Sequence, residues 1–510
     1  MVKSKKRENS LLTAAQAEHL LRTCVRELPF DGLFGSFHDV FGRIRTEGSH
    51  KAANHGLIAY QIAALLKYII VYGEDLKKLP YRDMAPYINA WKHLWRAAER
   101  EQTYSRDPDT VATFLVRFIY ANLPFSQHKD LIDSNLTRAL SLFVTFASQY
   151  THETFDFNAE FLSRYHLTPE HFIRLGWEFY KAFLSRVDWT AKELESVVPI
   201  DLKPSVPQGL SILAGSRQKF IDDYRRVRAT EALQAPYEPN PLLWIPIVAA
   251  DGRYYAPYPE LVAYAATRGL FFRCGSELGA AFHEAFGDWF ETYVGNLLRI
   301  MVRSGEVIRA AEEKELGYTG KNVDWTVLLG NTGLLVECKS SALFLPGKIL
   351  ATPSVVSNDL AKNLVGEGKG LFQIHEKLQA IKRGDLPTTL RERYANITTW
   401  YPVVILYDQI QHANSKPVLG NLLDSALREA GIADFDYQIW HIEELENLLD
   451  LVPEADLILQ IQRKWEDPKM FHWDLNAYLH SIFGHDRLKS YILVPEKDSV
   501  SYKILEELSD

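Results

Sequence analysis

Two carboxylates and one lysine stand close together in the segment KNVDWTVLLGNTGLLVECKSS (321–341). Asp324 lies in one apolar run, and Glu337 and Lys339 lie two residues apart in the next. Carboxylate oxygens are the ligands that Mg²⁺ and Mn²⁺ prefer, and two carboxylates held close together without a cation repel each other. A bound divalent ion can acidify a water molecule and polarise a phosphate oxygen, and a nearby lysine can stabilise the developing charge. The chemistry indicated is hydrolysis of a phosphodiester bond.

The spacing of these residues predicts that they share one face of a β-hairpin. GNTG, between the two apolar runs, contains the glycines that a tight turn needs. If Leu329 pairs with Leu334, Asp324 lies opposite Lys339, and Glu337 follows on the same face because side chains alternate along a strand. A register shifted by two residues keeps the three charged side chains together.

A cross-strand salt bridge between Asp324 and Lys339 is the alternative interpretation, with Glu337 as a solvated neighbour. The bare pattern of Asp, twelve residues, Glu, one residue and Lys is loose enough to allow it. Both runs are strongly apolar, however, so the sheet should be covered by other elements. Charged residues inside covered strands usually have a role, and we therefore favour the metal site.

The order of elements around these residues resembles that of the PD-(D/E)xK nuclease superfamily, which includes restriction enzymes and many phage-defence nucleases. The resemblance covers roughly residues 240–450, and Asp324, Glu337 and Lys339 match the motif, with Val323 in place of its proline. It implies an α/β (α+β) restriction-endonuclease-like core with a mixed central sheet. It also implies Mg²⁺ as the cofactor, for which Mn²⁺ can substitute, and nucleic acid as the substrate, with DNA favoured over RNA.

The same resemblance implies two further site residues. The superfamily often adds a glutamate from the helix before the sheet, and Glu291 borders the apolar stripe of FGDWFETYVGNLL. Glu284, seven residues earlier and on nearly the same face, is the competing candidate. Some branches place a glutamine on the helix after the Glu-x-Lys strand, which matches Gln373, although the usual tyrosine four residues later is missing. Glu291 would join Asp324 and Glu337 as a metal ligand, and Gln373 would complete the catalytic set.

The net charge of −8 and the pI near 6.1 exclude a protein coated in positive charge. Any nucleic acid must therefore meet a local basic patch. An exposed loop or helix face is the alternative interpretation for each candidate basic residue. The candidates follow the Glu-x-Lys strand: Lys348, Lys362, Lys369, Lys377, Lys382, Arg383, Arg391 and Arg393.

The chain divides into three regions by its patterning. Apolar residues recur at three- and four-residue spacing in the first part, which predicts a large all-α region over 1–235 with a sensing or regulatory role. The proline-rich QAPYEPNPLL (234–243) suits a linker. We predict the nuclease domain over 236–450 and a helical C-terminal extension over 451–510.

Strands and helices alternate inside the predicted nuclease domain. Asp251-Gly252 indicates a hairpin turn. The remaining expected elements are a long helix at about 276–303, a strand in GEVIRAAE, the Asp and Glu-x-Lys strands, a helix near 370–382, and strands in YPVVILYD and DYQIWHI.

The most hydrophobic stretch, 56–73, is interrupted by Gln61 and Lys67, which predicts a buried helix rather than a membrane span. The three cysteines are far apart and form no Cys-x-x-Cys pair, which favours a reducing cytoplasm. The N-terminus lacks the apolar run of a secretory signal. We therefore expect a cytoplasmic protein without membrane contact.

The expected function is that of a metal-dependent endonuclease. A large helical region joined to such a nuclease resembles bacterial anti-phage defence effectors, in which the added region recognises a phage protein as trigger. A homodimer would suit the cutting of both strands. A catalytically inactive nuclease-like scaffold or binding protein is the alternative.

Overall fold

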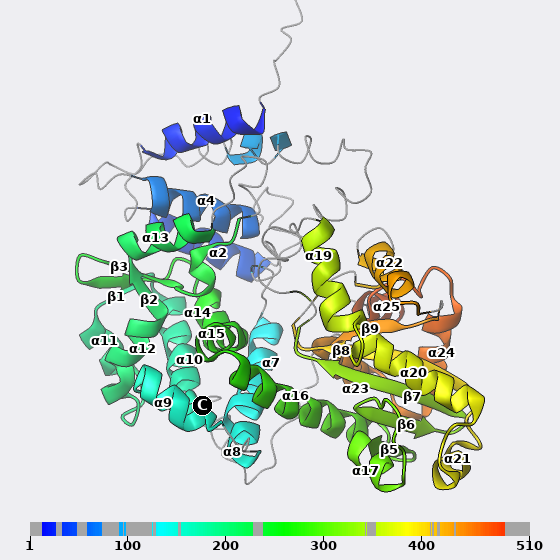
Figure 1. Cartoon of the computed structure of the whole chain (residues 1–510). Coiled ribbons are helices and arrows are strands. Elements are labelled where there is room, and N and C mark those ends of the chain that lie inside the picture. Colours follow the sequence, from blue (N-terminus) through cyan, green and yellow to red (C-terminus); the bar gives the residue numbers. More distant parts are fainter. Residues whose placement is uncertain are drawn as a thin grey trace, which may run out of the picture. The chain divides into compact units, whose positions relative to one another are not determined.

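The 510-residue chain forms two compact units, of which one comprises residues 1–127 and 178–265 and the other 128–177 and 266–510 (Figure 1). Each unit contains helices and a mixed β-sheet, so the fold is mixed α and β. The computed structural model describes residues 13–26, 33–47, 59–73, 91–94, 96–97, 125, 129–150, 155–227, 238–341, 343, 353–408, 410, 413–415, 419–432 and 435–484.

Helices α1 (Ala14–Arg26), α2 (Phe34–Glu47) and α4 (Ala59–Tyr72) supply much of the core of the first unit. Residues 62–70 of α4 are all buried, which confirms the predicted buried helix. Lys67 lies among them because its ammonium group is paired with the buried carboxylate of Glu238 at 3.6 Å. Among the described helices, none combines the length and the apolar character that a membrane span requires.

The first unit also contains a four-stranded sheet in the order β1-β4-β3-β2. Its strands are β1 (Asp188–Trp189), β2 (Ala214–Ser216), β3 (Ile247–Ala250) and β4 (Arg253–Tyr255). Of the hydrogen-bonded neighbours, β2 and β3 pair parallel, and the other two pairs are antiparallel. The predicted hairpin turn is confirmed, with φ of 49° at Asp251 and 73° at Gly252. The prediction of an all-α region over 1–235 is wrong, because β1 and β2 lie within it. Strands of two and three residues are too short to show the alternation that a sequence pattern can detect.

The other α-helices of the described residues are α7 (Lys129–Leu140), α8 (Ala147–Gln149), α9 (Phe157–Tyr165), α10 (Pro169–Ser185), α11 (Ala191–Val197), α12 (Val206–Leu213), α13 (Arg217–Val227), α14 (Glu260–Ala266), α15 (Arg268–Leu278), α16 (Ala280–Met301), α17 (Ala310–Glu315), α19 (Pro353–Leu360), α20 (Gly370–Arg383), α21 (Thr388–Tyr394), α22 (Asn421–Glu429), α23 (Ile442–Leu451), α24 (Glu454–Glu466) and α25 (Leu475–Phe483). The helix expected at about 276–303 is thus α16, which Gly279 separates from α15.

The sheet of the second unit has five strands that lie in chain order: β5 (Glu306–Arg309), β6 (Trp325–Leu329), β7 (Thr332–Lys339), β8 (Thr399–Leu406) and β9 (Gln438–His441). β6 is antiparallel to both of its neighbours, β5 and β7, and β8 and β9 run parallel to β7. A parallel neighbour needs a crossover connection, and α20 lies in the connection between β7 and β8. All five strands confirm the sequence prediction for this region.

Helices α16 and α20 cover opposite faces of this sheet (Figure 1). Trp325 of β6 faces α16, where its indole lies so close to Gly295 that any side chain there would collide with the ring. The next residue, Thr326, donates its hydroxyl to Glu313, which in turn pairs with Lys377 of α20. Because successive strand residues point to opposite faces, the two helices enclose β6, which begins directly after the predicted aspartate.

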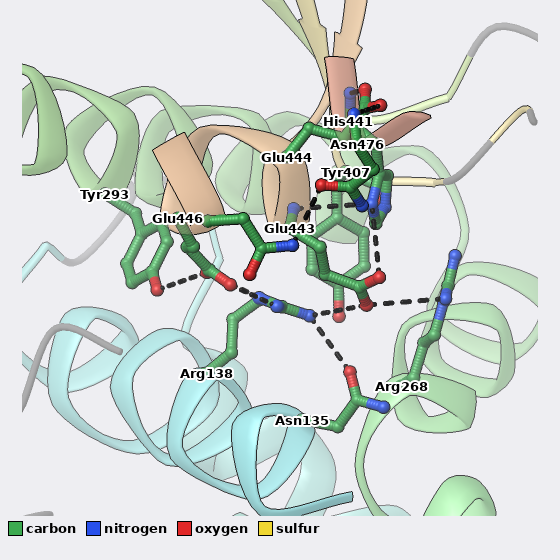
Figure 2. A network of polar contacts seen from close by, with 11 residues as sticks. Asn135, Arg138, Arg268, Tyr293, Tyr407, His441, Glu443, Glu444, Glu446 and Asn476 are labelled. Carbon is green, nitrogen blue, oxygen red and sulfur yellow. Dashed lines mark hydrogen bonds and ion pairs between the residues drawn. The ribbon is translucent and has the colours of Figure 1, made fainter. Parts of the chain in front are cut away.

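A buried polar network joins α7, α16 and α23 (Figure 2). Arg138 donates to the carboxylate of Glu446 from Nε at 2.9 Å and from Nη2 at 2.5 Å, and Tyr293 donates to the same carboxylate at 2.7 Å. Nη1 of Arg138 donates to Asn135 at 3.0 Å and to Glu443 at 3.4 Å. The network holds α16, which carries a predicted site residue, against two other helices.

Candidate functional site

Strands β6 and β7 form the predicted hairpin in a register that differs from the prediction by two residues. Leu329 pairs with Thr332, whereas Leu334 was the predicted partner. Only Gly330 and Asn331 form the turn, and Gly330 has a φ of 61°. A glycine with positive φ at the first position of a two-residue turn fits the right-handed twist of a hairpin. The longer GNTG turn was therefore the wrong expectation.

Asp324, Glu337 and Lys339 nevertheless share one face of this hairpin. The observed register, continued by one residue beyond Trp325, places Asp324 opposite Glu337, with Lys339 two residues further along β7. Lys339 Nζ donates to Glu337 Oε1 at 2.6 Å. Asp324 Oδ2 accepts a hydrogen bond from the backbone N–H of Cys338 in β7 at 2.7 Å. The structure thus brings the three predicted residues together.

The two carboxylates are poorly compensated by positive charge. Glu337 is fully buried, and its Oε2 has no hydrogen-bond partner in the described part of the chain. Burial and the negative charge of Asp324 raise the pKa of Glu337 to about 8, against the opposing effect of Lys339. Burial also raises the pKa of Asp324. Burial lowers the pKa of Lys339, but the charges of Glu337 and Asp324 raise it by more. The net shift is upward, so this lysine stays charged.

Helix α16 brings Glu291 beside the hairpin. Burial and the charge of Asp324 raise the pKa of Glu291, while Arg309 opposes them. The Glu291 carboxylate accepts a hydrogen bond from Arg309 Nε at 2.9 Å, and its backbone carbonyl accepts one from Trp325 Nε1 at 3.0 Å. Glu284, the competing candidate, is an exposed residue of the same helix. The electrostatic contact with Asp324 favours Glu291 as the helix carboxylate.

Gln373 of α20 contacts the segment that precedes β6 and contains the aspartate. Its side-chain amide donates to the backbone carbonyl of Asn322 at 2.9 Å, two residues before Asp324. This contact holds the approach to β6 against α20. The structure therefore assigns Gln373 a positioning contact with the backbone.

Two residues beside the site, Asp288 and Arg309, were not predicted from the sequence. Asp288 lies one helical turn before Glu291, and its charge raises the pKa of both Glu291 and Asp324. Arg309 lowers the pKa of the same two carboxylates. The three-residue spacing on α16 could have indicated Asp288, because such residues are neighbours on a helix surface. Arg309 reaches the site only because it pairs with Trp325 across β5 and β6, which no local pattern reveals.

The prediction that Lys377 contacts phosphate is wrong. This lysine is fully buried, its ammonium group pairs with the buried carboxylate of Glu313, and it lies 3.7 Å from the ring centroid of Tyr318. Lys348 lies outside the described residues. The other predicted basic residues are exposed, as expected for phosphate contacts: Lys362, Lys369, Lys382, Arg383, Arg391 and Arg393.

The donor set suits a hard divalent cation. A cation between Asp324 and Glu337 would remove their mutual repulsion and give a ligand role to Glu337 Oε2, for which the described residues supply no hydrogen-bond partner. In the described chain no three His, Cys, Asp or Glu side chains already stand in a metal-binding arrangement, and Glu291 is held by Arg309. Mg²⁺ is often bound by one or two carboxylates together with water and substrate phosphate, so two carboxylates are sufficient.

Comparison of the chain with known protein families, with characterised proteins and with solved structures found no match. The function must therefore be argued from the geometry of the residues themselves.

Proposed function

We propose that the protein is a metal-dependent endonuclease that hydrolyses phosphodiester bonds of nucleic acid, with DNA as the favoured substrate and RNA as the second. One observation carries this proposal: Asp324, Glu337 and Lys339 meet on one face of the β6–β7 hairpin, and Glu337 Oε2 is buried there with no hydrogen-bond partner among the described residues. Buried, closely spaced carboxylates beside an ammonium group are rare unless the site has a role.

The succession of elements supports the proposal. Helix α16 is followed by the antiparallel strands β5, β6 and β7, then by α20 and the parallel strand β8. This is the order that the resemblance to PD-(D/E)xK nucleases implies. A restriction-endonuclease-like core is therefore part of the proposal.

Each site residue has a defined part in the proposed chemistry. Asp324 and Glu337 would hold Mg²⁺, for which Mn²⁺ can substitute, and Glu291 would join them after release from Arg309. When bound, the ion supplies a Lewis acid for a phosphate oxygen and lowers the pKa of a water molecule. Lys339 would stabilise the negative charge that develops on the phosphate. Gln373 would keep the strand of Asp324 in position through its contact with the backbone.

The test is a cleavage assay with the full chain. Supercoiled plasmid, linear duplex DNA and transfer RNA are each incubated with the protein in Mg²⁺, in Mn²⁺ and in EDTA. We expect cleavage that needs the metal, that is lost in Asp324→Ala and Lys339→Ala, and that persists in Glu284→Gln as the matched control on exposed surface. Metal-dependent cleavage that survives both site substitutions would refute the assigned site.

The wider role rests on the resemblance to anti-phage effectors. We propose a cytoplasmic defence nuclease whose N-terminal region recognises a phage protein, with a homodimer as the form that cuts both strands. Adding candidate phage proteins to a preparation that does not cleave tests the trigger, and the mass of the protein in solution tests the dimer. A chain that cleaves fully by itself, at a rate that no candidate phage protein changes, would contradict the regulatory role.

An inactive nuclease-like scaffold is the second candidate. The observation that favours it is the absence, in the described residues, of three acidic or other ligating side chains already arranged around a metal. A scaffold would bind nucleic acid or protein without cleaving under any metal or trigger. Cleavage by the wild-type chain that Asp324→Ala abolishes would exclude it.

A further inference from the structure

Two arginines lie over one indole ring at the edge of the candidate site. Arg299 comes from α16 and Arg309 from the end of β5, and their guanidinium carbons are 4.8 Å and 5.8 Å from the ring centroid of Trp325. Because both distances are measured to the same centroid, their sum is an upper limit, and the two guanidinium carbons are at most about 11 Å apart. A nucleic-acid strand places a phosphate at about every 3.4 Å of helix axis, so both groups fall within the span of a few neighbouring phosphates.

The ring is covered, whereas both cations reach solvent. Trp325 is 2% exposed, the side chain of Arg309 is 41% exposed, and Arg299 is an exposed residue. The cation–π contact with the indole orients each guanidinium group before any ligand arrives. A planar guanidinium group with its fork of donors is the side chain best matched to a phosphate.

These arginines are connected directly to the predicted catalytic residues. Arg309 Nε donates to the carboxylate of Glu291, and Trp325, which follows Asp324 in the chain, donates to the backbone carbonyl of Glu291. The charge of Arg309 also lowers the pKa of Asp324. A phosphate bound at this pair would therefore neighbour the phosphate held at the carboxylates.

The surroundings explain why cations are needed here. Asp288, Glu291 and Asp324 make this part of the second unit acidic, and an approaching polyanion would be repelled by them. Binding of a nucleic-acid backbone therefore requires positive groups beside the carboxylates, in addition to any metal. Arg299 and Arg309 supply them.

We propose that Arg299 and Arg309 bind backbone phosphates of the nucleic-acid strand next to the phosphate that is cleaved. This inference rests on the proposed nuclease function, because it names the substrate contacts of the same site. Phosphate contacts position a strand without reading its bases, so the pair would add affinity without adding sequence preference.

The experiment measures binding without cleavage. The full chain is titrated in EDTA against fluorescein-labelled duplex DNA, single-stranded DNA and duplex RNA of one sequence, and fluorescence anisotropy gives Kd at several salt concentrations. Arg299→Gln and Arg309→Gln are compared with Arg428→Gln, an exposed arginine of α22. Arg309→Lys keeps the charge, and circular dichroism melting checks that each variant is folded.

Each neutral substitution should reduce the slope of log affinity against log salt by about 0.9 on duplex DNA and about 0.7 on single strands. At 0.1 M salt this corresponds to a roughly eightfold weaker Kd per arginine on duplex DNA. Arg428→Gln and Arg309→Lys should keep the wild-type slope. The polymer bound most tightly identifies the substrate class.

The outcomes separate this inference from the proposed function. Unchanged slopes in both glutamine variants overturn the inference even if the wild type cleaves. Reduced slopes in a protein that cleaves nothing support the phosphate contacts and contradict the nuclease proposal. Weaker binding with an unchanged slope, or no wild-type binding to any polymer, also overturns the inference.

Discussion

Arg138 and Glu446 are 308 positions apart in the chain, and their side chains form a bidentate ion pair inside the second unit. Arg138 is 3% exposed and Glu446 is 1% exposed. Tyr293 of α16 donates to the same carboxylate (Figure 2), so the pair also fixes the helix that carries Glu291. Two charges this deeply buried are tolerated only because each is paired and hydrogen-bonded.

Arg138→Met should strongly destabilise the second unit. The substitution leaves the carboxylate of Glu446 buried without its counter-charge, and loss of one partner of a buried pair costs about 3–5 kcal/mol. Chemical denaturation followed by tryptophan fluorescence measures the loss of unfolding free energy. Arg428→Gln, on exposed surface, should change it by less than about 0.5 kcal/mol. A loss below about 1 kcal/mol for Arg138→Met would contradict the importance of the network.

His441 should make the protein less stable in mild acid. Its Nε2 donates to the carbonyl of Tyr407 at 2.7 Å and its Nδ1 accepts from the backbone N–H of Glu443 at 3.3 Å, so the ring is neutral with its proton on Nε2. Burial lowers the pKa of His441 to about 3; Glu443 opposes this shift, and Arg268 and Arg138 reinforce it. The unfolded chain therefore binds the extra proton first as the pH falls, and stability is lost between about pH 6.5 and pH 3.

His441 Nδ1 caps the start of α23 by accepting the hydrogen bond from the Glu443 backbone N–H. The matching variant is His441→Asn, because asparagine can also cap a helix but does not titrate. Between pH 7 and pH 5, wild type should lose about 2 kcal/mol more unfolding free energy than the variant. Denaturation curves at both pH values give this difference. Parallel losses in the two proteins would show that the His441 ring is not held neutral.

Mg²⁺ should stabilise the wild-type protein after treatment with EDTA. A ligand that binds only the folded state contributes about 2.7 kcal/mol at 100 times its Kd, and Asp324 and Glu337 are the expected ligands. Thermal unfolding with and without Mg²⁺ or Mn²⁺ measures the effect. Glu337→Gln should lose most of it, and Glu284→Gln should keep it. Equal stabilisation of all three proteins would place the metal elsewhere.

Lys339→Met should impair the cleavage step more than metal binding. Removal of one group that stabilises transition-state charge typically lowers kcat about 10²–10³-fold. Because the carboxylates remain, Mg²⁺ should still raise the unfolding temperature of this variant. Lys469→Met, at an exposed lysine that follows α24, is the control and should cleave like wild type. A Lys339→Met protein with wild-type kcat would remove the lysine from the mechanism.

Gln373→Ala should lower cleavage by a roughly tenfold to 100-fold factor, because small misplacements of catalytic groups are costly. The substitution removes the hydrogen bond to the carbonyl of Asn322 and so loosens the strand that carries Asp324. Gln379→Ala is the matched control, since Gln379 lies on the same helix and contacts His375. An equal effect of both variants would indicate a general loss of helix stability.

The sequence by itself was enough to place Asp324, Glu337 and Lys339 on one face. Side chains alternate along a strand, so an error of two residues in the register leaves every side chain on its face. The same local patterning predicted the five strands of the second sheet and the buried helix α4. Periodicity is a property of neighbouring residues, and a single chain displays it directly.

Only the tertiary structure decided which distant residues meet. The pair of Arg138 and Glu446, the burial of Lys377 against Glu313, and the approach of Arg309 to Glu291 all join separate elements. Such contacts depend on how whole helices and strands pack, and the free energy of that packing is spread over many side chains. A charged residue in the sequence therefore looks the same whether it faces solvent, as at Arg299, or closes a buried pair, as at Arg138.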